Sequence, residues 1–146
     1  MDVLIDHPAV ARSSPDAWRC VRIEYALPEF GTDFGTQDNP HEASLDRRAV
    51  SWSKGCYLGQ EVVCMQDMRG KVKRRVVRLD ADGPAALAAG TPVLAGSETV
   101  GEITSSCRSA DDSRVRSLAR VLTKALEGGV ELRAAGRVVR AAGEPR

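Results

Sequence analysis

The sequence predicts an α+β fold, in which a partly helical region to about residue 67 precedes a small antiparallel β-barrel that runs to the C-terminus. Two observations lead to this fold class. A capping residue and an apolar stripe indicate a helix over residues 15–26. From residue 71 onward, short β-prone segments alternate with turns rich in Gly, Asp and Ser, a rhythm typical of small barrels and sandwiches.

The predicted helix has clear end signals. Ser14 can cap its first turn, and Pro28 cannot continue a helix, so we expect the helix to stop before it. Three large apolar residues recur on one stripe of this helix, namely Trp18, Val21 and Tyr25.

The remaining segments complete the predicted organisation. Residues 2–6, DVLID, resemble a short strand with nothing beside it to pair with, and residues 31–48 form a polar loop with no sustained period. We place a boundary at 67–68, which gives a region 1–67 and a barrel domain 68–146. The predicted strands lie within residues 71–79, 91–96, 98–106, 117–123, 130–136 and 137–142.

Length and composition exclude several classes of protein. With 146 residues, the chain fits one ordinary domain or two small ones, and 42% apolar with 28% charged residues is globular composition. The net charge is +1, so a basic site must be a local patch rather than a property of the whole molecule. The opening MDVLID is not a secretory signal and no segment could span a membrane, so we expect a soluble cytoplasmic protein.

The cysteines and histidines do not indicate a metal site. No pair shows the short two-residue spacing of zinc ribbons, and free thiols without a secretory signal suggest a reducing compartment. The four cysteines are Cys20, Cys56, Cys64 and Cys107, and the two histidines are His7 and His41.

The segment KGCYLGQE, residues 54–61, concentrates polar chemistry around one cysteine. A thiol reacts mainly as thiolate, which the cation of Lys54 favours, and two glycines let the backbone bend close to a ligand. The alternative is that Cys56 is a small buried apolar residue, and no histidine is spaced to activate it. The candidate motif consists of Lys54, Gly55, Cys56, Tyr57, Gly59, Gln60 and Glu61.

This segment resembles the signature of the YgfZ-type folate-binding proteins, which are relatives of the glycine-cleavage aminomethyltransferases (GcvT). Further segments resemble the family in the same order, at 22–33, 39–46, 69–79, 100–106 and 117–121. The resemblance implies a partial folate-binding region followed by the family's C-terminal barrel. It covers only the C-terminal portion of complete members, so we expect a truncated or split protein. Two positions depart from the family's usual glycine, Ala26 and Ser44.

The resemblance also implies site residues and a cofactor. Glu24 falls where the family's folate-contacting glutamate stands, and a carboxylate can accept paired hydrogen bonds from a pterin. The alternative is a solvated helix glutamate paired with Arg22. Lys54 and Gln60 would contribute to the same tetrahydrofolate site, including for polyglutamylated forms. Cys56 matches the YgfZ-type cysteine, which the aminomethyltransferase branch does not carry in this form, and is the candidate catalytic residue.

A basic run follows the boundary. In RGKVKRRVVR, Lys71, Lys73 and Arg75 would share one face of a strand. They could form a solvated strand end, or an anion patch for a folate polyglutamate tail or RNA phosphates. No aromatic residue is interleaved with the run, so direct nucleic-acid binding is not expected.

Three functions follow from these residues and the resemblance. The first is a folate-binding accessory protein that supports iron–sulfur cluster assembly or repair and cluster-dependent enzymes such as tRNA-modifying ones. The second is a tetrahydrofolate-dependent aminomethyltransferase, and the third is a non-catalytic fragment that binds a partner protein. The partners expected for the first are folate and iron–sulfur assembly or client proteins. Whether the chain is an enzyme stays open at this point.

Overall fold

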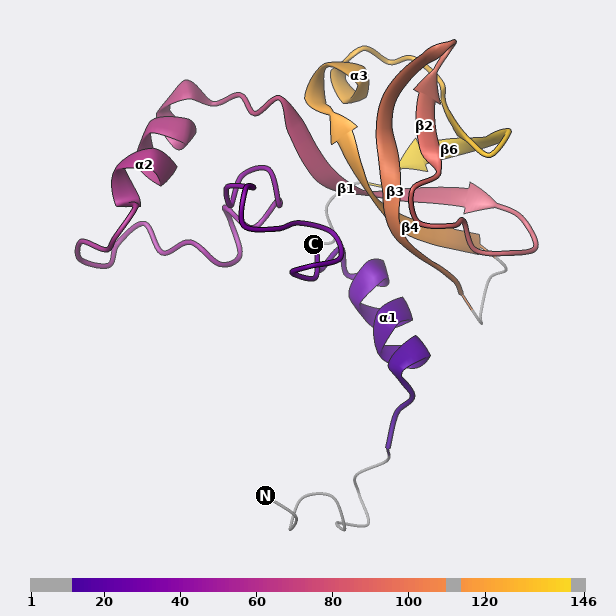
Figure 1. The fold of residues 1–146 in the computed structure, drawn as a ribbon, viewed down its shortest axis with the longest axis horizontal. Helices are drawn as coiled ribbons and strands as arrows, with labels where there is room; N and C mark the ends of the chain where they lie inside the picture. The colour runs from indigo at the N-terminus through magenta and orange to yellow at the C-terminus, as the bar shows by residue number, and fades with distance from the viewer. Residues whose placement is uncertain (1–11, 110–113, 143–146) are drawn as a thin grey trace.

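The structure, a computed structural model, describes residues 12–109 and 114–142. Figure 1 shows a barrel on one side, with α1 beneath it and α2 standing apart on the far side of a long connecting segment, residues 25–53. The segment 2–6, for which a strand was predicted, lies outside the described residues. No helix in the described part of the chain is long and apolar enough to cross a bilayer.

The helices and strands are bounded as follows. The helices are α1 (Pro15–Glu24), α2 (Gln60–Arg69) and the short α3 (Thr123–Glu127). The strands are β1 (Arg74–Asp82), β2 (Pro92–Ala95), β3 (Glu98–Arg108), β4 (Arg114–Leu122), β5 (Leu132–Ala134) and β6 (Arg137–Ala141).

The strands form a closed barrel in the order β1-β4-β3-β2-β5-β6, and every neighbouring pair is antiparallel. The predicted α+β fold with a small antiparallel barrel is therefore confirmed. The boundary at 67–68 falls in the last turn of α2, and the barrel itself begins at Arg74. The division into two domains stays a prediction.

The barrel interior is filled by aliphatic side chains that alternate with outward residues along each strand. A bulge in β3 interrupts this alternation, because the pairing with β4 shifts register between Ile103 and Ser105. Ile103 faces the interior, whereas Cys107 packs outside the barrel, against α1. The interior cluster includes Leu79, Val93, Val100, Val115, Val121 and Val139.

Helix α1 packs on the outside of the barrel, against β3 and β4. Its buried face carries Arg22 and Ile23, and Ile23 joins Val76 and Leu118 in a second apolar cluster. The predicted apolar stripe is not this face: Trp18, Val21 and Tyr25 are 56%, 44% and 56% exposed. The barrel therefore contacts a different face of the helix from the one that carries these three large apolar residues.

The end of α1 corrects one expectation. The helix stops at Glu24, two residues earlier than predicted, and Pro28 is not the residue that ends it. Instead, Ala26 adopts a left-handed conformation with φ of 49°, while Leu27 N–H donates to the Arg22 carbonyl (2.7 Å) and Ala26 N–H to the Ile23 carbonyl (3.0 Å). These two bonds make a Schellman motif, in which the left-handed position is usually glycine.

Ser44 also has positive φ, 57°. Both departures from the family's usual glycine therefore occupy the left-handed region, which an L-residue with a Cβ adopts at a cost of roughly 1–2 kcal/mol. At Ser44 the hydroxyl offsets part of this cost, because it donates to the Val76 carbonyl at 2.7 Å. At Ala26 no side-chain hydrogen bond is possible.

Candidate functional site

Glu24 lies at the last position of α1, beside the barrel. Its side chain is 52% exposed, and its carboxylate lies 3.9 Å from the guanidinium of Arg116. Its backbone carbonyl accepts a hydrogen bond from Arg78 Nη1 at 2.5 Å, which fixes the helix end on β1. The carboxylate thus lies near a cation and is half exposed to solvent.

The motif 54–61 lies on the turn that leads into α2. Gly59 has φ of 83° and stands at the N-cap of the helix, so the backbone uses the conformational freedom of glycine there, whereas Gly55 does not have positive φ. Cys56 is a free, exposed thiol, so it is not the small buried apolar residue considered as the alternative. The Lys54 ammonium lies over the Tyr57 ring, 4.6 Å from its centroid.

Glu24 and the motif are not brought together in this arrangement. Glu24 ends α1 next to the barrel, whereas Lys54, Cys56 and Gln60 belong to the segment around the start of α2, which Figure 1 shows on the other side of the connecting segment. The sequence grouped these residues into one folate site. Their assignment to a common ligand stays a prediction.

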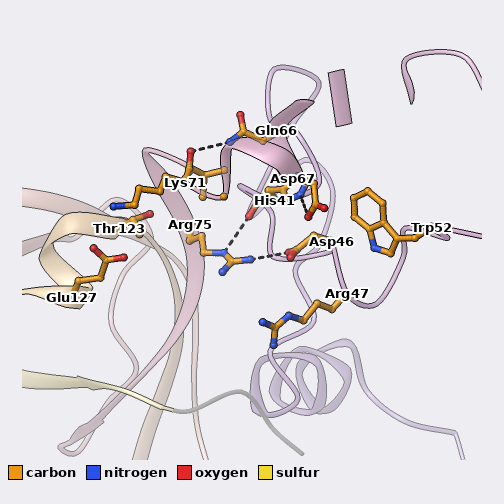
Figure 2. A pocket seen from close by; sticks show the side chains of 12 residues that line it. His41, Asp46, Arg47, Trp52, Gln66, Asp67, Lys71, Arg75, Thr123 and Glu127 are labelled. Atoms are coloured by element: carbon orange, nitrogen blue, oxygen red, sulfur yellow. Dashed lines mark hydrogen bonds and ion pairs between the residues drawn. The ribbon is translucent and has the colours of Figure 1, made fainter. Parts of the chain in front are cut away.

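A concavity lies between the connecting segment, the end of α2 and the start of the barrel (Figure 2). It encloses about 480 Å³ and is lined by Lys71 and Arg75 of the predicted anion patch, but not by Lys73. The lining carries both signs of charge and one indole. The residues named in Figure 2 are His41, Asp46, Arg47, Trp52, Gln66, Asp67, Lys71, Arg75, Thr123 and Glu127.

Two acidic neighbours already pair with Arg75 and His41 of this pocket. Arg75 Nη2 donates to Asp46 Oδ1 at 2.8 Å, and its Nε donates to the His41 carbonyl at 3.3 Å. His41 Nε2 lies 3.3 Å from Asp67 Oδ1, which ties α2 to the connecting segment. Arg75 is therefore committed to holding the chain together, and Lys71 is the exposed cation of the predicted patch that lines the pocket.

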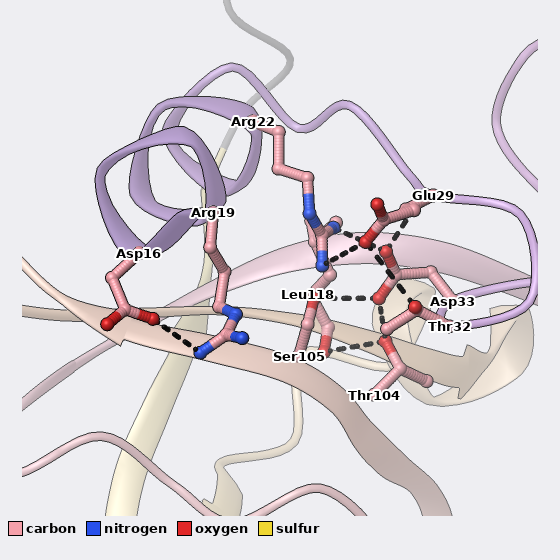
Figure 3. Close-up of polar contacts among 9 residues, drawn as sticks. All are labelled: Asp16, Arg19, Arg22, Glu29, Thr32, Asp33, Thr104, Ser105 and Leu118. Carbon is pink, nitrogen blue, oxygen red and sulfur yellow. Dashed lines mark hydrogen bonds and ion pairs between the residues drawn. The ribbon is translucent and has the colours of Figure 1, made fainter. Parts of the chain in front are cut away.

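A buried polar cluster that the sequence did not single out joins α1, the connecting segment and the barrel (Figure 3). Asp33 is fully buried; its Oδ2 accepts from Arg22 Nη1 at 2.6 Å and from the backbone N–H of Glu29 at 2.9 Å. Its Oδ1 accepts from Thr104 Oγ1 at 2.5 Å and Ser105 Oγ at 2.7 Å.

Through Asp33, this cluster links the C-terminal end of α1 to β3. The β3 bulge brings two consecutive hydroxyls, of Thr104 and Ser105, to the same carboxylate. Arg22 pairs inward with Asp33 rather than with Glu24, the partner considered from the sequence. Both residues lie in the segment 22–33 that resembles the family. Arg22 begins its Arg-Ile-Glu and Asp33 ends its Gly-Thr-Asp, so the sequence did carry a signal for this pair.

The described part of the chain contains no cluster of side chains that could bind a metal ion. No three His, Cys, Asp or Glu residues of this part converge as a metal site would require.

Comparisons with known proteins identify relatives whose matches cover part of this chain and a small part of their own length. An aminomethyltransferase of Thermosynechococcus vestitus is 34% identical over 85 residues, which are 58% of this chain and 23% of that protein. The tRNA-modifying protein YgfZ of Hamiltonella defensa is 40% identical over 67 residues, 45% of this chain and 20% of that protein. An iron–sulfur cluster assembly factor, the mitochondrial IBA57 homolog of Chaetomium globosum, is 49% identical over 39 residues, 26% of this chain and 9% of that protein.

A solved structure shares the fold. The glycine cleavage system aminomethyltransferase T from Bartonella henselae superposes with a TM-score of 0.72 at 18% identity, covering 89% of this chain and 39% of that protein. No protein-family model matches the chain. The chain spans about a quarter or less of the length of these curated relatives. In sequence and in fold, the chain is thus similar to the C-terminal portion of the YgfZ and aminomethyltransferase (GcvT) proteins.

Proposed function

We propose that this chain is the folate-contacting C-terminal portion of a YgfZ-type accessory protein, which supports iron–sulfur cluster assembly or repair and cluster-dependent enzymes such as tRNA-modifying ones. The observation that carries the proposal is the exposed Cys56 in a motif that resembles the YgfZ signature. The names of two relatives, a tRNA-modifying YgfZ and an iron–sulfur cluster assembly factor, support the same branch.

Tetrahydrofolate fits the chemistry of Glu24. A half-exposed carboxylate that lies 3.9 Å from the Arg116 guanidinium retains lone pairs for the amino and ring N–H groups of a pterin. Because this carboxylate lies on an open surface, it can bury little of a ligand. We expect the isolated chain to bind tetrahydrofolate weakly, since each 1.4 kcal/mol of lost contact weakens binding about tenfold.

Calorimetric titration with tetrahydrofolate tests the role of Glu24. Binding should fall in Glu24→Ala and stay unchanged in Glu98→Ala, which removes another exposed carboxylate, on β3. Equal binding by both variants would make Glu24 a solvated helix residue. Tight binding by the isolated chain would contradict the expected low burial of the ligand.

The accessory role is tested by complementation. In a host lacking its own YgfZ-type protein, the wild-type sequence, completed with the rest of a relative, should restore the activity of iron–sulfur enzymes. Cys56→Ser should fail to restore it, whereas Cys64→Ser, which alters the neighbouring thiol on α2, should succeed. Full rescue by Cys56→Ser would remove the thiol from the proposal.

The second candidate function is that of an aminomethyltransferase, because two of the similar proteins named above, one of them a solved structure, carry that name. Conversion of a methylamine-bearing lipoyl carrier in the presence of tetrahydrofolate would favour it. Folding without measurable folate affinity would favour the third reading, a fragment that binds a partner protein.

A further inference from the structure

Two cysteines far apart in the sequence meet where α1 contacts the barrel. Cys107, on β3, is 6% exposed and belongs to the apolar cluster with Ile23 and Leu118. Cys20, on α1, is partly buried and packs against the same cluster. Its Sγ donates to the carbonyl of Arg108, the residue after Cys107, at 3.9 Å, so both thiols lie at the same contact between α1 and β3.

Both elements present these side chains for definite reasons. The bulge in β3 reverses the inward-outward alternation, so that Cys107 packs on α1 rather than inside the barrel. On α1, Cys20 precedes Ile23 by three positions and therefore shares the face that contacts the barrel. The other two cysteines, Cys56 and Cys64, belong to the motif and α2, on the far side of the connecting segment.

We propose that Cys20 and Cys107 form a dithiol site that closes to a disulfide and cross-links α1 to β3 when the chain meets a small-molecule disulfide of the glutathione type. The inference rests on the packing of α1 and is independent of the folate function. It assigns the co-reactant by its chemistry, a symmetrical low-molecular-weight disulfide that accepts two electrons.

The reaction balances in two exchange steps. The Cys20 thiolate, the more accessible of the two, attacks one sulfur of the small disulfide, forms a mixed disulfide and expels one small thiolate. The Cys107 thiolate then attacks the Cys20 sulfur and expels the second small thiolate. Two protein thiols lose two electrons and two protons, and one small disulfide is reduced to two thiols.

The surroundings of Cys107 make the second step slow at neutral pH. Burial raises the pKa of the Cys107 thiol to about 12, with further contributions from the hydrogen bond and charge of Cys20 and from Glu24, while Arg116 on β4 lowers it. Below that pKa the thiolate fraction grows tenfold with each pH unit, so ring closure should accelerate about tenfold per unit.

Intact-mass analysis of the full chain with oxidised glutathione at pH 7 to 10 tests the site. A Cys56→Ser/Cys64→Ser background leaves the two proposed thiols as the reactive ones. We expect a mixed disulfide first, then loss of the glutathione and a protein lighter by two hydrogens, with closure about tenfold faster per pH unit. Peptide mapping should join Cys20 to Cys107, and circular dichroism checks that the fold persists at each pH.

Single variants distinguish the two steps. In the same background, Cys107→Ser should stop at the mixed disulfide, and Cys20→Ser should stay unmodified while folded, because Cys107 is buried. Absence of ring closure at pH 10 in a folded chain would overturn the proposal. Rapid modification of Cys107 in the Cys20→Ser variant would also overturn it, because Cys107 would then not depend on its neighbour for access.

Discussion

Replacing Asp33 by alanine should be among the most destabilising single changes in this chain. The substitution removes a fully buried carboxylate that accepts four hydrogen bonds. Among the described residues, it leaves the guanidinium of Arg22, itself 3% exposed, with the Glu29 carboxylate at 3.2 Å as its ion-pair partner. Breaking a buried ion pair from one side typically costs about 3–5 kcal/mol, because the remaining charge is desolvated without compensation.

The hydroxyls of Thr104 and Ser105 lose their acceptor as well. Each buried donor left unpaired costs about 1–3 kcal/mol, partly offset where Thr104 can still donate to the Leu118 carbonyl at 3.1 Å. We therefore expect Asp33→Ala to lower the free energy of unfolding by at least about 3 kcal/mol. A typical domain has about 5–15 kcal/mol in total, so the loss is a large share of the stability.

Urea denaturation followed by far-ultraviolet circular dichroism measures this loss. The matched control is Asp16→Ala, which breaks the exposed Asp16–Arg19 pair at 3.1 Å and should change the free energy of unfolding by less than about 1 kcal/mol. In a double-mutant cycle, Arg22→Met should cost less in the Asp33→Ala background than in the wild type. A cost below about 1 kcal/mol for Asp33→Ala, or equality with the control, would refute the buried-pair reasoning.

Three further predictions concern the backbone and one thiol. Gly101→Ala should destabilise by about 1–3 kcal/mol in urea, because its Cβ would meet the Arg120 carbonyl oxygen, whereas Gly35→Ala meets nothing within 4 Å and should be near neutral; equal effects would contradict the close strand approach. Ala26→Gly should raise the melting temperature, because the cost of the left-handed conformation at Ala26, roughly 1–2 kcal/mol, exceeds the about 0.5–1 kcal/mol that the greater backbone freedom of glycine costs, and a lower melting temperature would contradict the strain. The pKa of Cys107 is raised to about 12 in the folded state, so the folded state holds its proton longer than the unfolded chain. Stability should fall by up to about 1.4 kcal/mol per pH unit between about pH 9 and 12, and Cys107→Val should remove that slope in urea titrations across this range.

The barrel could be predicted because its signals are local. Each strand lies within, or within a few residues of, a segment that alternates apolar and polar residues and ends at a turn. The closed strand order could not be predicted in the same way, because β1 pairs with both β4 and β6 through contacts between distant parts of the sequence.

The site was less predictable, for physical reasons that differ between residues. Exposure of Trp18 and Tyr25 depends on which helix face the barrel meets, and periodicity does not specify that face. The role of Asp33 depends on a bulge in β3, about seventy positions later in the chain. The two glycines of the motif both permit positive φ, and Gly59 adopts it whereas Gly55 does not, a difference that the residue type alone could not predict.

Helix α2 has ten residues and none of them is buried. A helix this short is marginal in isolation, and here polar contacts near its C-terminal end hold it: Asp67 to His41, and Gln66 Nε2 to the Lys71 carbonyl at 2.8 Å. Its amides should therefore exchange with solvent hydrogen through local opening, at a free energy far below that of the barrel. A partner that binds the Cys56 segment together with α2 would have to stabilise the helical state of α2 as it binds. Its apparent affinity would then include the free energy of folding α2, and mutations that stabilise this helix would tighten binding without touching the partner.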